Sequence, residues 1–281
     1  MADAFLPRIA GARAFRAFCT PRLSSHRSAD HERLVARARF HLRSARSQRL
    51  ATSVGKIQTY VVEATDGRPA SVLLVHGWTG EAAFMGAFAD YMRRRGLGSV
   101  LFDLPAHGQS AGRQTNLMDC AHAVREVAEA MGSIRFAIGH SMGGLAALVA
   151  GEGRHPMPGS FSFEAYVLVA MPDQFADVTR RFGDEQALSP ADLQAFERRL
   201  ERLARRKIAD FTGSKLLTAT GRPALLIHAR DDQEVPFEDA ERLAASTPCS
   251  ELRVLDGLGH RAILYAPPVM RAAAAFIERF Q

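Results

Sequence analysis

Short apolar runs alternate with amphipathic stretches of helical length over most of the chain, and this alternation limits the folds open to it. Unbroken apolar runs of strand length are typical of a parallel sheet that is covered on both faces. Strands are expected at residues 71–75, 99–103, 134–138, 165–170, 224–228 and 251–255, with helices at 82–95, 117–131, from 142, at 237–245 and at 262–280. The pattern predicts an α/β fold with a mostly parallel central sheet and helices on both faces.

A glycine-rich turn follows the strand expected at 134–138. The six residues from Gly139 to Gly144 read GHSMGG and match G-x-S-x-G, with a helix expected to start at Met142. Between a strand and a helix this pattern is typical of a nucleophile elbow, a strained turn that exposes a serine hydroxyl. We therefore predict Ser141 as a nucleophile. The alternative is an ordinary serine that caps the helix.

A serine hydroxyl needs a base to become a nucleophile, and the base needs an orienting partner. Asp231 and Asp232 follow the strand expected at 224–228, and His260 follows the strand expected at 251–255. Because parallel sheets place their sites at the C-terminal ends of the strands, these residues are expected near Ser141. Spacing alone leaves the choice between the two aspartates open.

The chain resembles the α/β-hydrolase superfamily from about residue 49 to residue 280, and is most like bacterial esterases, lipases and monoacylglycerol-lipase-like enzymes. Five segments carry the resemblance: HGWTG at 76–80, DLPAHGQS at 103–110, the turn at 139–144, DQEVP at 232–236 and GH at 259–260. They occur in the order typical of the family, with serine, acid and histidine in that sequence. The resemblance implies an α/β-hydrolase fold with a small helical lid.

The resemblance also implies the roles of the catalytic residues: Ser141 attacks, His260 acts as base, and an acid orients the base. In the family two residues separate this acid from a Val-Pro pair, and Asp232 occupies that position before Val235. Asp231 is then expected to be a neighbouring surface carboxylate.

An oxyanion hole is implied by the same resemblance, formed by the backbone N–H groups of Trp78 and Met142. Two fixed donors aimed at a developing oxyanion are what acyl transfer requires. The implied activity is a carboxylic-ester hydrolase, of esterase or lipase type, that forms an acyl-enzyme. The alternatives are a thioesterase, acyltransferase or C–C hydrolase on the same residues, or a non-catalytic binding protein of the same fold.

Composition argues against several other functions. Motifs such as H-E-x-x-H, C-x-x-C and G-x-x-x-x-G-K-[ST] do not occur in the sequence, so neither a metal nor a cofactor is expected.

The net charge of +6 comes from residues 1–50, which hold eleven arginines and three acids, while the remaining residues hold 25 basic and 27 acidic ones. A nucleic-acid partner would need a basic face on the folded domain, so none is expected. Without an apolar run of membrane-spanning length or a secretory signal, a cytoplasmic location is expected.

Residues 1–47 are expected to form a basic helical arm. An apolar stripe with helical spacing runs through Phe5, Ile9, Ala12, Phe15 and Phe18. The favoured role is docking on the domain, near the lid or a second subunit. Weak contact with an anionic membrane and an organelle-targeting or disordered leader are the alternatives.

The hydrolase core is expected in two parts, residues 48–171 and 223–281, and to open with two short strands about Gly55. The helical lid is expected at 172–222. Ser189 and Pro190 predict the start of a lid helix. Its apolar stripe comprises Leu193, Phe196, Leu200, Leu203 and Ile208, with Arg198, Arg199, Arg202, Arg205 and Arg206 mostly on other faces.

The expected partner is a small-molecule ester, with an acyl or lipid-like ester as one option.

Overall fold

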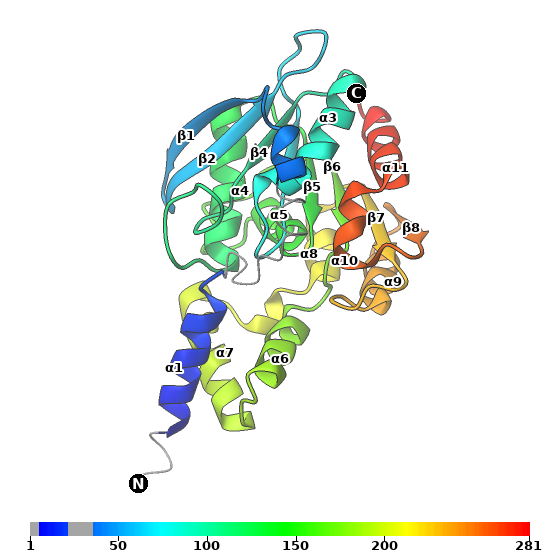
Figure 1. Cartoon of the computed structure of the whole chain (residues 1–281). Helices are drawn as coiled ribbons and strands as arrows, with labels where there is room; N and C mark the ends of the chain where they lie inside the picture. The colour runs from blue at the N-terminus through cyan, green and yellow to red at the C-terminus, as the bar shows by residue number, and fades with distance from the viewer. Residues whose placement is uncertain (1–5, 22–35) are drawn as a thin grey trace.

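The computed structural model describes residues 6–21 and 36–281 of the chain. Within these ranges a central sheet crosses the molecule, helices lie on both of its faces, and further helices lie beyond one end of its strands (Figure 1). The predicted α/β fold with its mostly parallel sheet is therefore confirmed. Phe5, which belongs to the predicted apolar stripe, lies outside the described residues.

The sheet of the described ranges has eight strands in the order β1-β2-β4-β3-β5-β6-β7-β8. Their bounds are β1 (Arg46–Thr52), β2 (Gly55–Val62), β3 (Val72–Val75), β4 (Ser99–Phe102), β5 (Phe136–His140), β6 (Ala165–Val169), β7 (Ala224–Ala229) and β8 (Ser250–Leu255). β2 pairs antiparallel with β1 and β4, and the remaining neighbours pair parallel. Every residue of β3 to β7 is buried, which explains their unbroken apolar sequence.

The helices are α1 (Leu6–Phe18), α3 (Gly86–Arg94), α4 (Leu117–Met131), α5 (Met142–Glu152), α6 (Phe175–Glu185), α7 (Pro190–Ala204), α8 (Gly213–Thr220), α9 (Phe237–Ala245), α10 (Gly259–Ala262) and α11 (Pro267–Glu278). One apolar core joins α4, α5 and α8 to the sheet, and a second joins α3 and α11 to its other face. Among the helices of the described ranges, none combines the length and the apolar character that a membrane crossing requires.

Side-chain caps set the ends of two predicted helices. The Asn116 side chain accepts from the N–H groups of Met118 and Asp119, and α4 ends at Gly132 in the left-handed conformation. The Ser189 hydroxyl accepts from the N–H of Asp192 at 3.2 Å, and α7 starts directly after it at Pro190. Both helices begin at the residues where the sequence predicts them.

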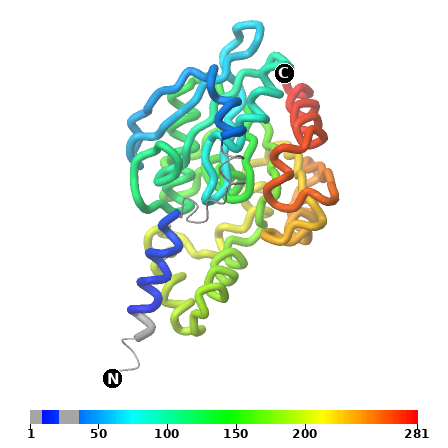
Figure 2. The backbone as a smooth tube through the Cα atoms, in the orientation of Figure 1, coloured from blue at the N-terminus to red at the C-terminus, as the bar shows by residue number. Residues whose placement is uncertain are grey.

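Helices α1, α6 and α7 form what we call the three-helix layer, which lies beyond the C-terminal ends of the parallel strands (Figures 1 and 2). α1 and α7 run side by side although they are far apart in the sequence. A Cβ on Gly11 would lie 2.7 Å from the Cβ of Ala195, so glycine allows this close approach. Ala14 and Phe18 are buried on the same side of α1, whereas Ile9 is 50% exposed. The buried face is therefore rotated from the predicted stripe.

The predicted arm and lid do not coincide with single structural units. Residues 36–40 are helical and pack on the core, where Ala38 is buried and Arg39 Nε lies 2.9 Å from Glu81 Oε1. β1 already starts at Arg46, inside the segment predicted as arm. In the predicted lid segment, α8 packs against α5 on the face of the sheet, so only α6 and α7 belong to the three-helix layer.

Candidate active site

A sharp turn between β5 and α5 carries Ser141. Its backbone has a φ of 51° and a ψ of −125°, a conformation that costs a non-glycine residue roughly 1–3 kcal/mol and is found at functional sites. The Ser141 N–H donates to Val169 O of β6 at 2.9 Å. A Cβ on Gly139 would collide with the backbone of Gly144. Ser141 thus lies at the strained strand-to-helix turn that the sequence pattern predicts.

His260 and Asp232 are joined by a hydrogen bond: His260 Nδ1 donates to Asp232 Oδ2 at 2.8 Å. The other carboxylate oxygen accepts from the N–H groups of Glu234 and Val235, both at 2.8 Å. Burial by itself raises the pKa of Asp232, but the hydrogen bonds from His260 and the two N–H groups outweigh it and lower the pKa. The ionised carboxylate fixes the ring with its proton on Nδ1, which leaves Nε2 able to accept one.

The neighbouring carboxylate, Asp231, holds the loop that precedes the histidine. Its two oxygens accept from the N–H groups of Gly257 and Gly259 at 2.9 and 3.1 Å. The structure therefore brings Asp232 to the ring of His260 and Asp231 to the backbone before it. Sequence reasoning anticipated only a surface carboxylate at 231, because a contact between two loops leaves no local pattern.

His140 is a further residue of the site for which sequence reasoning found no role. Its Nε2 donates to the backbone oxygen of His260 at 2.9 Å, and the two ring centres are 4.7 Å apart. Burial, together with repulsion from His260, lowers the pKa of His140 to about 3. A neutral His140 thus supports the backbone of His260. Its place inside the elbow was the only signal for this contact.

Ser141 and His260 both line a cavity of about 470 Å³. The Ser141 hydroxyl makes no hydrogen bond with any residue that the structure describes. On the cavity side of the histidine, Nε2 lies 3.9 Å from Glu234 Oε2, and Glu234 is held by Arg261 at 2.9 Å. Catalytic hydrogen bonds are often open in ligand-free sites and close around the substrate.

Trp78 and Met142 line the same cavity. A Cβ on Gly77 would lie 3.1 Å from the Cβ of Ser141, so the loop that carries Trp78 runs directly beside the serine. Met142 is the first residue of α5, where a helix N–H has no partner within the helix. Neither the Trp78 nor the Met142 N–H donates a hydrogen bond within the described ranges. Two free donors therefore lie next to Ser141.

Two buried histidines hold the loop of Trp78 in place. His76 Nε2 accepts from the Leu104 N–H at 3.0 Å, and His107 Nε2 accepts from the Thr79 N–H at 3.3 Å. Burial lowers the pKa of His76 to about 3 and that of His107 to about 4. Both rings are neutral at physiological pH, as these acceptor roles require, and they serve the loop rather than the reaction.

The three-helix layer forms the other wall of the cavity, with Ala17, Phe18 and Thr20 at the end of α1 and Val178, Arg181, Phe182, Glu185 and Gln186 on and after α6. The Phe18 ring stacks on that of Trp78, with 6.0 Å between centres and 21° between planes. Phe18 also packs edge-on against Phe182 at 5.1 Å. The N-terminal helix therefore reaches the site itself. The spacing of aromatic residues in this helix predicted that it packs on the domain, but it did not predict contact with the site.

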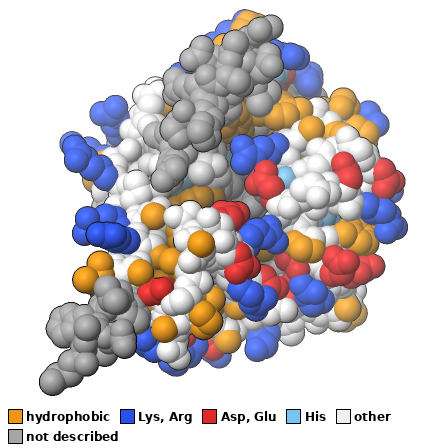
Figure 3. Space-filling model, turned by 60° about the horizontal axis from the view of Figure 1, so that its bottom comes forward, with side chains coloured by type: hydrophobic (Ala, Val, Ile, Leu, Met, Phe, Trp, Pro, Cys, Tyr) orange, Lys and Arg blue, Asp and Glu red, His pale blue; other side chains and the backbone are white. Residues whose placement is uncertain are grey.

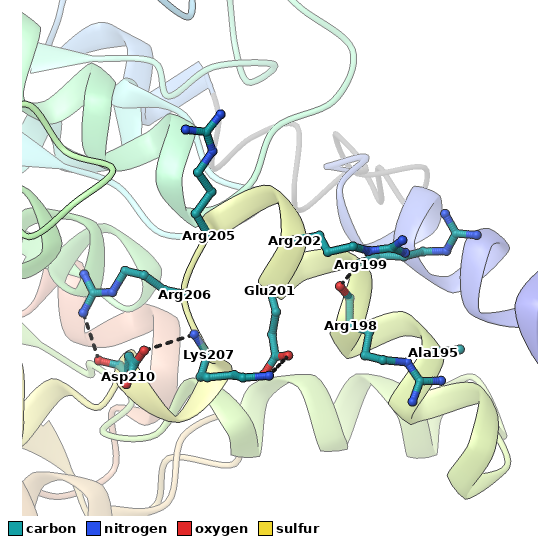
Figure 4. Close-up of a pocket in the computed structure, with 9 residues that line it drawn as sticks. All are labelled: Ala195, Arg198, Arg199, Glu201, Arg202, Arg205, Arg206, Lys207 and Asp210. Atoms are coloured by element: carbon teal, nitrogen blue, oxygen red, sulfur yellow. Dashed lines mark hydrogen bonds and ion pairs between the residues drawn. The ribbon is translucent and has the colours of Figure 1, made fainter.

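A larger hollow of about 990 Å³ lies at the end of α7 (Figure 4). It is lined by Ala195, Arg198, Arg199, Glu201, Arg202, Arg205, Arg206, Lys207 and Asp210. Arg206 is paired with Glu152 at 2.7 Å and Lys207 with Glu201 at 3.0 Å. Arg205 and Arg198 point in opposite directions (Figure 4). Because the described lining contains no serine, cysteine or histidine, the candidate site is the smaller cavity.

Comparison with known families agrees with this geometry. The family described as "Alpha/beta hydrolase family" matches residues 72–276. The match spans the sheet from β3 onward and includes Ser141, Asp232 and His260. The chain belongs to the α/β hydrolase family. No curated protein matches the chain in sequence.

Solved structures with the same fold include several esterases. Est1E from Butyrivibrio proteoclasticus, with ferulic acid bound, has a TM-score of 0.65 and 16% identity over 83% of this chain and 98% of that chain. A thermophilic esterase from Thermogutta terrifontis has a TM-score of 0.61 and 17% identity over 84% of this chain and 99% of that chain. The Pyrococcus furiosus esterase Pf2001 has a TM-score of 0.61 and 20% identity over 84% and 92%. At these identities the likeness establishes the fold.

Proposed function

We propose that the protein is a serine carboxylic-ester hydrolase of esterase or lipase type. The observation that carries the proposal is the hydrogen bond from His260 to Asp232 at the edge of the cavity that Ser141 lines. A serine at a strained elbow, an imidazole and a buried carboxylate are the groups that nucleophilic acyl transfer requires. The esterases of similar fold support this choice among the reactions of the family.

In the first half-reaction Ser141 Oγ bonds to the carbonyl carbon of the ester while its proton passes to His260 Nε2. Asp232 stabilises the imidazolium that forms and keeps the ring oriented. The carbon–oxygen bond to the alcohol then breaks, and the alcohol leaves with the proton from His260. The acyl group remains on Ser141.

Water completes the cycle. It attacks the acyl-enzyme, gives a proton to His260 Nε2 and releases the carboxylic acid, and the proton returns to Ser141. In both halves the oxyanion is bound by the Trp78 and Met142 N–H groups, each worth roughly 3–4 kcal/mol in such a site. The side chains, the backbone and the attacking water supply each proton and hydrogen bond of this scheme, so it requires no cofactor.

We also propose that the three-helix layer serves as the lid. Its apolar residues on the cavity, chiefly Phe18, Val178 and Phe182, suit an acyl chain. A cytoplasmic location, and contact of the N-terminal segment with a membrane or a second subunit, stay predictions from the sequence.

The test is a set of p-nitrophenyl esters of increasing acyl length, assayed beside an acyl-thioester of matched length. We expect hydrolysis of the esters with an optimum in chain length, and a loss of about 10³-fold or more in Ser141→Ala. A faster reaction with the thioester would favour thioesterase activity. Ester hydrolysis that is absent from the wild type, or unchanged in Ser141→Ala, would overturn the proposal.

A further inference from the structure

One cation lines the active-site cavity without a partner. Arg181 on α6 is half-buried and faces the cavity that Ser141 and His260 line. Within the described part of the chain its guanidinium makes no hydrogen bond and no ion pair. Arg180, the preceding residue, is by contrast paired with Asp177 at 2.8 Å and has a largely exposed side chain. Of these two arginines of α6, Arg181 faces the cavity and has no ion-pair partner among the described residues.

The acidic residues of the cavity do not neutralise Arg181. Glu234 is bound by Arg261 at 2.9 Å. Glu185 lies one turn after Arg181 on α6, but it is exposed to solvent and no ion pair joins the two. Acidic and basic side chains are interspersed on the face that carries the three-helix layer (Figure 3). A negatively charged substrate would therefore be selected by direct contact with Arg181, and not by the electrostatic potential of a large basic surface.

The surroundings of Arg181 make its charge effective. Phe18, Trp78, Val178 and Phe182 line the same cavity, and an ionic hydrogen bond is stronger beside such apolar groups than in water. The planar guanidinium matches a carboxylate with two parallel hydrogen bonds. Arg181 is the only lysine or arginine among the described lining residues. The single positive charge of Arg181 neutralises the single negative charge of a carboxylate. A doubly charged phosphate would keep one negative charge without a partner.

We propose that Arg181 binds a carboxylate on the substrate, so that the enzyme prefers esters that carry one free carboxylate away from the reacting carbonyl. The proposal rests on the proposed ester hydrolysis and adds the class of substrate. Arg181 acts by binding: it touches the substrate, while Ser141 and His260 carry out the reaction at the other end of the ester.

The test compares p-nitrophenyl esters that differ only in a terminal carboxylate. The mono-esters of succinate, glutarate and adipate are paired with butyrate, pentanoate and hexanoate, so that the best length is found in the assay. We expect the wild type to prefer the charged member of at least one pair. Arg181→Gln is expected to lower kcat/KM for that ester by roughly 10- to 100-fold, mainly through KM, as loss of a hydrogen bond to a charged group implies.

Three controls accompany this variant. The neutral partner ester is expected to change less than about threefold in Arg181→Gln, because its binding does not use the charge. Arg180→Gln is expected to leave both esters unchanged, and Arg181→Lys to restore part of the preference. Melting curves establish that the variants are folded.

The outcomes separate the two proposals. If the wild type hydrolyses both esters of every pair without preferring the charged one, or if Arg181→Gln lowers both equally, the carboxylate site is wrong while the ester hydrolase stands. If the wild type hydrolyses no ester at all, the proposed function is wrong and the carboxylate site falls with it.

Discussion

The two walls of the cavity around Ser141 are built in different ways. On the sheet side, Ser141 and Asp232 lie in the turns after β5 and β7, and His260 lies in the short helix α10 that follows β8. All three are tied by hydrogen bonds to backbone or to one another. On the other side, Phe18 and Arg181 come from helices of the three-helix layer, about 160 residues apart in the sequence, and side-chain packing joins those helices.

This difference implies that the two walls have different functions. Hydrogen-bonded segments that follow the strands of a sheet hold a reacting geometry within narrow limits, as catalysis of a chemical step requires. Packed helices determine the shape and charge of the wall that faces the rest of the substrate. Changes on the sheet side are therefore expected to affect all substrates alike, and changes in the layer to affect the choice between substrates.

The largest expected effect is that of Ser141→Ala. Removing the proposed nucleophile is expected to lower kcat on every ester by about 10³- to 10⁶-fold, because the serine, histidine and aspartate of such a site act as a unit. The loss is expected to be the same for short, long, charged and neutral esters, measured on protein with an unchanged melting curve. A variant that retained activity within tenfold of the wild type would remove Ser141 from the reaction.

The neighbouring aspartates provide the next comparison. Asp232→Asn is expected to lower kcat by about 10⁴-fold, because the imidazole loses the partner that fixes its tautomer. Asp231→Asn keeps one acceptor oxygen for the loop before His260, so it is expected to lower kcat by less than about tenfold. Steady-state rates with one ester measure both variants. A larger loss in Asp231→Asn would contradict the assignment of Asp232 to the ring.

Phe18→Ala tests the layer side. Phe18 contacts the rings of Trp78, Phe175, Phe182 and Phe196, and its removal is expected to destabilise the protein by about 3–5 kcal/mol. The preferred acyl length is expected to shift, while the rate with a short ester changes less than about tenfold. Rates across the acyl series and thermal melting measure both. Phe15→Ala, on the same helix but not on the cavity, is the control: a matching shift in preference there would contradict a role for Phe18 in the wall.

Gly11→Leu gives the smallest expected effect, since it disturbs only the contact between α1 and α7. A side chain at 11 meets Ala195 and the backbone of Phe196, and such overpacking typically costs about 1–3 kcal/mol. The melting temperature is expected to fall by several degrees, at about 2–4 °C per kcal/mol for a chain of this size. Ile9→Ala, on the exposed side of α1, is expected to melt like the wild type. Equal melting of both variants would mean that α1 does not depend on this contact.

The sheet side could largely be predicted from the sequence. The elbow is a local pattern whose glycines and strand-to-helix context fix the position of Ser141. Spacing alone did not separate Asp232 from Asp231, but the resemblance to the family favoured Asp232, and the hydrogen bond from His260 falls on that residue. Ser189 and Pro190 likewise predicted the start of α7, and α4 begins at Leu117, where the helix at 117–131 was expected.

The layer side could not be predicted in this way, because contacts between distant helices leave no local pattern. The expected stripe of α1 included Ile9, which is exposed, and that of α7 included Leu203, which is 42% exposed. Periodicity indicates that a helix has an apolar face, but the true face depends on the partner, here on the fit of Gly11 against Ala195. Phe18 stacks on Trp78 and Arg181 lines the cavity, and neither position could be inferred from a local pattern.

The central claim is that the turn after β5 presents an activated serine, and covalent labelling tests it most directly. The protein is treated with a fluorophosphonate, with and without prior unfolding, and the adduct is located by peptide mass spectrometry, with Ser141→Ala and Asp232→Asn in parallel. We predict one rapid adduct, on Ser141, that is absent from Ser141→Ala and from unfolded protein and forms far more slowly in Asp232→Asn. No rapid adduct in the folded protein, or an adduct on another residue, would contradict the account.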